Sequence, residues 1–60
     1  MTKEAIKFQI EAYASEADLY SDGAIFAQSE GRAEDAEYFL LHAVGCEKLA
    51  NDLRAKLRTM

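Results

Sequence analysis

Two heptad patterns that are out of phase with each other constrain the fold of this 60-residue chain more than any other feature. The first, here called the first seam, alternates steps of four and three residues through Ile6, Ile10, Tyr13, Ala17, Tyr20, Ala24 and Ala27. The second seam has the same alternation through Ala36, Phe39, Ala43, Cys46, Ala50, Leu53, Leu57 and Met60. Apolar residues at this spacing lie along one side of an α-helix. The sequence therefore predicts an all-α chain with two long helices.

The change of phase locates the turn between these helices. If the first seam continued past Ala27, it would place Gly31 and Glu34 on the apolar side, so the first helix ends before Gly31. We expect Gly31 to adopt the left-handed conformation that commonly ends a helix. The first seam runs past Gly23 without a change of phase, so Gly23 lies inside the first helix. We predict one domain, residues 1–60, with helices over about 3–29 and 33–58 and a turn over about 30–32.

The expected helix ends carry signals that agree with these bounds. Thr2 is a preferred N-cap residue, and Met1 and Ile6 occupy the two positions of a hydrophobic staple. The second helix opens with acids and has its cations in its last half, an arrangement that complements the helix dipole.

Each expected helix has more apolar residues than one partner helix can cover. Phe8, Leu19 and Phe26 lie beside the first seam, and Leu40, Val44 and Leu49 lie beside the second. A single core in a chain below roughly 70–80 residues rarely supplies more than about 3–5 kcal/mol. We therefore predict a two-helix antiparallel hairpin that dimerises into a four-helix bundle. Its dimer core is expected to contain Ile10, Tyr13, Tyr20, Phe39, Cys46 and Leu53.

The charges predict how two hairpins pair. Residues 11–37 hold eight acids and one arginine, a net charge of −7, and the remaining residues hold six cations and three acids, a net charge of +3. A hairpin places these two groups at opposite ends. Charge complementarity selects orientation, so we expect an antiparallel, two-fold symmetric homodimer. The overall charge of −4 argues against a nucleic-acid partner, because such partners are held by lysines and arginines.

Residues that could carry chemistry are few. His42 and Cys46 are one helical turn apart and share a face. With a second copy they would supply two histidines and two cysteines, a ligand set for zinc, but two ligands per chain is a weak signal. The sequence has no glycine-rich phosphate loop and no serine–histidine–aspartate set. We expect no enzymatic activity and no cofactor.

Two surface sites are candidates for binding. Ile25, Tyr38 and Leu41 fall outside both seams, close to the turn and among acids that include Glu34 and Glu37. An apolar centre with a charged rim is typical of a protein-docking site. The second candidate depends on the glycines inside the helices. Gly23 and Gly45 either let neighbouring helices pack closely, or, together with Tyr20, open a pocket for a small molecule or nucleotide between subunits.

The chain also carries signals of its compartment. It has no apolar run of 18 or more residues and no apolar leader, so we expect no membrane span. A single cysteine favours a reducing, cytoplasmic setting. The sequence from Met1 to Met60 is interpreted as a complete small reading frame.

The segment "GAIFAQSEGRAEDAEYFLLHAV", residues 23–44, resembles one tetratricopeptide repeat. The matching residue types are Gly23, Phe26, Gly31, Ala36, Leu40 and Ala43. The spacing between the two glycines is one residue longer than in that family, and the terminal proline is missing. The resemblance implies a helical protein-interaction unit.

The overall plan is similar to the plasmid-encoded Rop family, with "MTK" at its start, a turn near residue 30 and a hairpin that dimerises. That family binds RNA loops through a polar, basic and aromatic face on its first helix. Only Lys3 matches here, because Ile10, Ala14, Asp18 and Ile25 stand where such residues would be expected. The resemblance extends to the architecture and not to RNA binding.

These observations predict a small regulatory or inhibitor protein, of the kind that phages or plasmids encode, that acts by binding another protein. A small-molecule or nucleotide binder is the alternative, and a purely structural assembly subunit is the third class.

Overall fold

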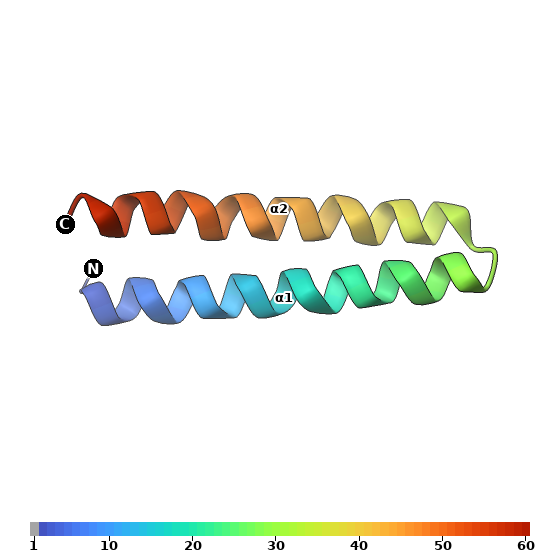
Figure 1. The fold of residues 1–60 in the computed structure, drawn as a ribbon, viewed down its shortest axis with the longest axis horizontal. Helices are drawn as coiled ribbons and strands as arrows, with labels where there is room; N and C mark the ends of the chain where they lie inside the picture. Colours follow the sequence, from blue (N-terminus) through green and yellow to red (C-terminus); the bar gives the residue numbers. More distant parts are fainter. Residues whose placement is uncertain (1) are drawn as a thin grey trace.

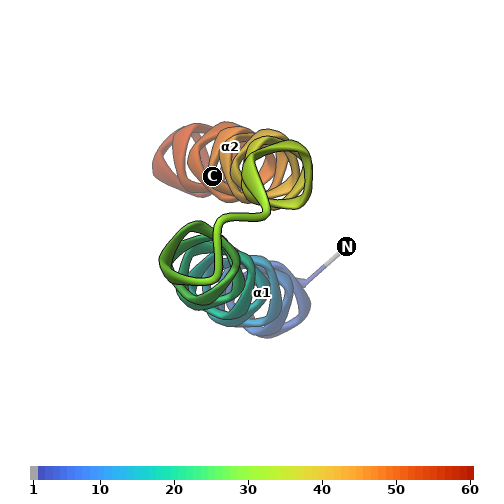
Figure 2. The same ribbon diagram turned by 90° about the vertical axis from the view of Figure 1, so that its right-hand side faces the viewer.

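The computed structural model describes residues 2–60, which form two antiparallel helices joined by a short turn (Figure 1). Helix α1 spans Lys3–Ser29 and helix α2 spans Ala33–Arg58, and the described residues contain no strand. The hairpin measures 45 × 13 × 12 Å. Viewed from the turn, the helices are slightly inclined to each other (Figure 2). The prediction of an all-α, two-helix hairpin is confirmed.

Helix α1 begins at the cap that the sequence predicts. The Thr2 hydroxyl oxygen accepts a hydrogen bond from the Ala5 N–H at 3.1 Å, and the Thr2 carbonyl accepts one from the Ile6 N–H, also at 3.1 Å. The first of these bonds satisfies one of the four N–H groups that a helix start leaves without a partner, and the second is the first main-chain hydrogen bond of the helix itself. The expected hydrophobic staple needs Met1, which lies outside the described residues.

Helix α1 ends in a Schellman motif. Gly31 has a φ of 75°, the left-handed conformation expected for it. The Gly31 N–H donates to the Gln28 carbonyl at 3.1 Å, and the Arg32 N–H donates to the Ala27 carbonyl at 2.9 Å. Glycine adopts this conformation without the steric cost that a Cβ atom brings, so this residue reverses the chain.

Helix α2 begins without a side-chain cap at Arg32. Ion pairs hold this start in place: the Arg32 guanidinium lies 3.3 Å from the carboxylates of both Glu30 and Asp35. At the other end, the Thr59 hydroxyl donates to the Lys56 carbonyl at 2.8 Å. Acids in the first turn and cations in the last turn complement the helix dipole.

Alanine fills most of the space between the helices. The buried apolar residues all belong to the two seams: Ile6, Ala17, Ala24, Ala27, Ala36, Ala43, Cys46 and Ala50. Ile6 is the only large side chain among them that is fully buried. The bulkier seam residues from Ile10 to Leu57 are half-buried, and Met60 beyond the end of α2 is 51% exposed.

Three contacts define the register of the two helices, and each joins residues equally far from Gly31. The Tyr20 and His42 rings stack, Gly23 lies against the Phe39 ring, and the Cys46 thiol meets the Glu16 carboxylate. This register places Tyr20 level with His42 and Phe39 level with Gly23. The Phe39 ring therefore faces a residue without a side chain, and the buried alanines of both seams allow the helices to approach closely.

Candidate functional site

Most of the large apolar side chains of this hairpin lie on its outside. Ten of them are between 46% and 71% exposed: Phe8, Leu19, Ile25, Phe26, Tyr38, Leu40, Leu41, Val44, Leu49 and Met60. A large apolar patch exposed on a soluble protein usually marks an interaction site. The distribution of these side chains over the hairpin therefore defines the candidate site.

Part of this surface forms one broad side of the hairpin, here called the aromatic face. Gly23 marks it on α1, because its backbone lies against Phe39 of α2. Leu19 and Phe26 lie one turn before and one turn after Gly23, so they point to the same side. Phe8 is eleven residues before Leu19 and belongs to the same stripe of α1. Helix α2 contributes Tyr38 and Leu49 to the aromatic face.

A cluster of four rings joins the helices in the half of this face that is nearer the turn. The His42 ring stacks on Tyr20 at a centroid distance of 5.0 Å and packs against Tyr38 at 4.4 Å. Phe39 contacts the same two tyrosines at 6.2 and 5.8 Å. Tyr38 and His42 are one turn apart, a signal that could have predicted their contact. The stacking of Tyr20 on His42 depends on the register between the helices and was not predicted.

The opposite side of the hairpin, here called the acidic face, carries a smaller apolar group. Ile25 lies two residues from Gly23, and Leu40 lies two residues from Tyr38, so both are about 200° round their helices from the aromatic face. Val44 follows Leu40 by one turn, and all three side chains are more than half exposed. The exposed acids beside them on the two helices are Asp18, Glu37 and Glu47.

The five predicted partner-binding residues are all exposed but are divided between the two sides. Glu34, Tyr38 and Leu41 share one stripe of α2, because steps of four and three residues separate them. Ile25 lies on the acidic face, and Glu37 lies one turn before both Leu40 and Leu41. The geometry therefore gives two surfaces in place of the single patch expected from proximity to the turn.

The two weak metal-ligand candidates have different surroundings. The buried Cys46 thiol donates a hydrogen bond to a Glu16 carboxylate oxygen at 3.6 Å, whereas the His42 ring stacks on Tyr20 and packs at a tilt against Tyr38. Burial raises the pKa of the Cys46 thiol, and the hydrogen bond to Glu16 and its negative charge raise it further. Such a thiol is a poor nucleophile at neutral pH. No group of three or more histidine, cysteine or acidic side chains within residues 2–60 is placed to hold a metal ion.

The two helical glycines of the predicted pocket have different environments. A Cβ atom at Gly23 would lie 3.5 Å from the Phe39 ring, an ordinary contact distance. A Cβ atom at Gly45 would meet nothing within 4 Å. Tyr20, the third predicted pocket residue, packs against the rings of Phe39 and His42.

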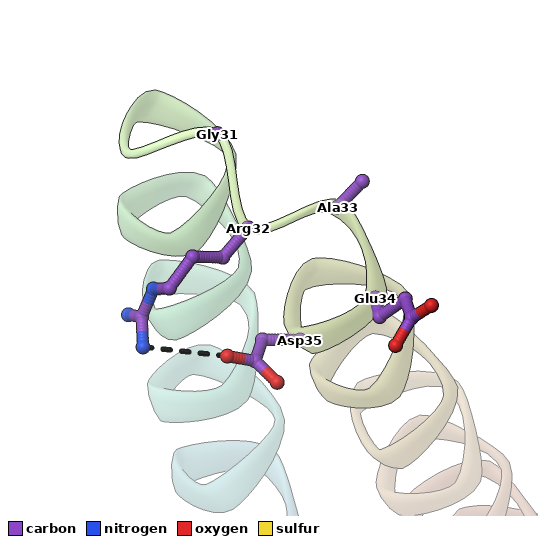
Figure 3. A pocket seen from close by; sticks show the side chains of 5 residues that line it. All are labelled: Gly31, Arg32, Ala33, Glu34 and Asp35. Carbon is purple, nitrogen blue, oxygen red and sulfur yellow. Dashed lines mark hydrogen bonds and ion pairs between the residues drawn. The ribbon is translucent and has the colours of Figure 1, made fainter.

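An open hollow of about 400 Å³ lies elsewhere, at the turn (Figure 3). It is lined by Gly31, Arg32, Ala33, Glu34 and Asp35. The Arg32 guanidinium in this hollow is neutralised by Glu30 and Asp35. The positive charge of Arg32 is therefore already paired with carboxylates of the same chain.

The six residues predicted for the dimer core lie along the two seams of a single chain. Cys46 is buried, and Ile10, Tyr13, Tyr20, Phe39 and Leu53 are half-buried. Each of these five keeps some surface that the second helix of the hairpin does not cover.

Neither helix of the described chain is long and apolar enough to cross a membrane. Comparison with protein-family models, curated proteins and solved structures gave no match to this chain.

Proposed function

We propose that this chain is a small, non-enzymatic regulatory or inhibitor protein that homodimerises and binds another protein through a helical surface. The observation that carries the proposal is the distribution of apolar residues, with mostly small ones between the helices and most of the large ones outside. Alanines fill the space between the helices, and ten larger apolar side chains are exposed on the outside. Two broad faces of one hairpin carry eight of these side chains, so one face can serve dimerisation while the other binds the partner.

The need for a second copy follows from the size of the core. Burying apolar area contributes about 25 cal/mol per Å², and an alanine side chain offers little such area. A two-helix chain with this core is expected to gain much of its stability from association. The aromatic face is the larger apolar surface, which favours it as the dimer face.

The acidic face is the surface that we assign to the partner protein. Ile25, Leu40 and Val44 give it an apolar centre, and Asp18, Glu37 and Glu47 give it a negative rim. A docking site with this anatomy fits a segment that presents apolar side chains flanked by lysines or arginines. The partner is therefore expected to contribute a basic amphipathic segment.

Affinity capture from the native host, followed by mass spectrometry, tests this proposal. Leu40→Ser should abolish capture of a specific protein, and Ala55→Ser, a change of an exposed α2 residue outside both proposed binding surfaces, should not. Circular dichroism and sedimentation should show that both variants keep the helical content and oligomeric state of the wild type. Capture of the same proteins by both variants would contradict the assignment of the acidic face.

A further inference from the structure

Gly45 is the residue that the isolated hairpin does not explain. It lies in the interior of α2, where glycine is less favourable than alanine by about 1 kcal/mol. Its backbone has ordinary helical geometry, since the positive φ in the chain is at Gly31. A Cβ atom at this position would meet nothing within 4 Å, so no contact inside the hairpin requires its absence. A neighbour from outside the chain would account for it.

On one side of α2, residues at equal distances before and after Gly45 are chemically complementary to each other. Gly45 lies at the middle of α2, with Leu41 and Leu49 four residues to either side. Tyr38 and Asp52 follow at seven residues, and Glu34 and Lys56 at eleven. All seven lie on one exposed side of the helix, here called the α2 outer stripe: Glu34, Tyr38, Leu41, Gly45, Leu49, Asp52 and Lys56. A second α2 running in the opposite direction would meet leucine with leucine, hydroxyl with carboxylate, and acid with base.

We propose that two copies of this chain pack α2 against α2 in antiparallel orientation, with the two-fold axis passing through Gly45. The proposal rests on the homodimer of the proposed function and specifies its face and register. The two Gly45 backbones meet where a side chain on either would hold the helices apart. Leu41 packs on Leu49 of the other copy, and the Tyr38 hydroxyl donates to the Asp52 carboxylate of that copy.

The same axis also brings the α1 helices into a complementary register. The contacts within the hairpin place Gly45 level with Ala17, fourteen residues to either side of Gly31. Phe8 and Phe26 lie nine residues before and nine residues after Ala17, both on the aromatic face. The two-fold rotation therefore brings Phe8 of one copy level with Phe26 of the other. These two pairs were not used to choose the axis.

Charge favours this antiparallel arrangement over a parallel one. The antiparallel register sets Glu34 beside Lys56 of the second copy, and it sets the acidic turn near the basic open end. A parallel dimer would place Glu34 beside Glu34 and Lys56 beside Lys56, and like charges in contact are unfavourable. A second copy is the occupant that these observations favour, because each residue of the stripe has its complement within the same helix.

Sedimentation equilibrium of the full chain tests the contact at Gly45. We expect Gly45→Leu to raise the dimer dissociation constant by roughly tenfold or more, because the new side chains would separate the two backbones. Asn51→Leu is the matched control, since it also places a leucine on α2 but on a side away from the α2 outer stripe. Circular dichroism should show that Gly45→Leu keeps or increases helical content. A dimer that is unchanged or tightened by Gly45→Leu would overturn the proposal.

A charge-reversal cycle tests the register. Glu34→Lys and Lys56→Glu should each weaken the dimer, roughly threefold to tenfold at low ionic strength, and the two together should restore it. Additive weakening in the double variant would contradict this register. A wild-type chain that remains monomeric at all concentrations would refute the homodimer itself, and with it this proposal. A wild-type dimer that is indifferent to both the Gly45 and the charge variants would refute only the face and register proposed here.

Discussion

The three glycines of this chain occupy different physical environments although the sequence presents two of them in similar helical contexts. Gly31 has a positive φ, Gly23 has ordinary helical geometry with a neighbour at contact distance, and Gly45 has open space around it. The heptad phase separates Gly31 from the others. The difference between Gly23 and Gly45 depends on where the second helix lies, and only the structure gives that information.

Alanine substitution should therefore have opposite effects at Gly31 and Gly23. Gly31→Ala is expected to lower the free energy of unfolding by about 1–2 kcal/mol, because a Cβ atom clashes in the left-handed conformation. Gly23→Ala should raise it by up to about 1 kcal/mol, since its Cβ atom fits at 3.5 Å from Phe39 and alanine favours a helix. Urea unfolding at one fixed protein concentration measures both. If both substitutions changed the free energy of unfolding in the same direction, the difference drawn here between Gly31 and Gly23 would be wrong.

The Cys46 thiol should titrate above the ordinary range of a cysteine. Burial disfavours the thiolate first, and the hydrogen bond to Glu16 and the negative charge of Glu16 add to that effect. Thiolate absorbance followed against pH should give a raised pKa, and Glu16→Gln should lower it towards the usual value. A thiolate pKa below that of a free cysteine would contradict the geometry around Glu16.

The same pKa shift predicts how stability depends on pH. Because the pKa is higher in the folded state, folding favours the protonated thiol. The resulting contribution to stability is complete below the unfolded pKa of cysteine and is lost as the pH rises through the folded pKa. Cys46→Ala should flatten this alkaline part of the stability curve. If Cys46→Ala lost as much stability at alkaline pH as the wild type does, the loss would have to come from groups other than Cys46.

At the scale of the helices, the sequence predicted where the buried residues are but not how large the core is. Every buried residue belongs to one of the two seams, because heptad spacing selects one side of a helix whatever the side chain. The pattern could not show that Tyr20 stacks on His42, because that contact depends on how the two helices are aligned. It also grouped Ile25 with Tyr38 through their shared proximity to the turn, although they lie on opposite faces.

The small size of most buried seam residues should make the seam intolerant of larger side chains. Ala43 is 5% exposed in the seam between the helices, so Ala43→Leu is expected to cost about 1–3 kcal/mol by overpacking. Ala33→Leu is the control, because Ala33 is exposed at the start of α2. Denaturant unfolding of the two variants gives the comparison. Equal stability of the two variants would contradict the packing of Ala43 between the two helices.

At the scale of the whole molecule, charge and apolar surface lead to the same account. Acids gather around the turn and cations at the open end, and the exposed apolar side chains lie along both broad faces. We propose that the aromatic face and the α2 outer stripe are covered by a second copy, and that the acidic face remains free for a basic partner segment. In this account one short chain uses its two faces for different kinds of binding.

The measurement that tests this account most directly is the distance between spin labels in the dimer. A single label at Ala55→Cys, in a Cys46→Ala background, lies ten residues from Gly45. In the antiparallel dimer the two labels should be separated by about 30 Å along the helix axes, from twenty residues at a rise of about 1.5 Å each. A parallel dimer would bring them to about 10–15 Å, close to the spacing of neighbouring helices. A distance near 30 Å is the result predicted here, and a short distance would contradict the antiparallel assembly.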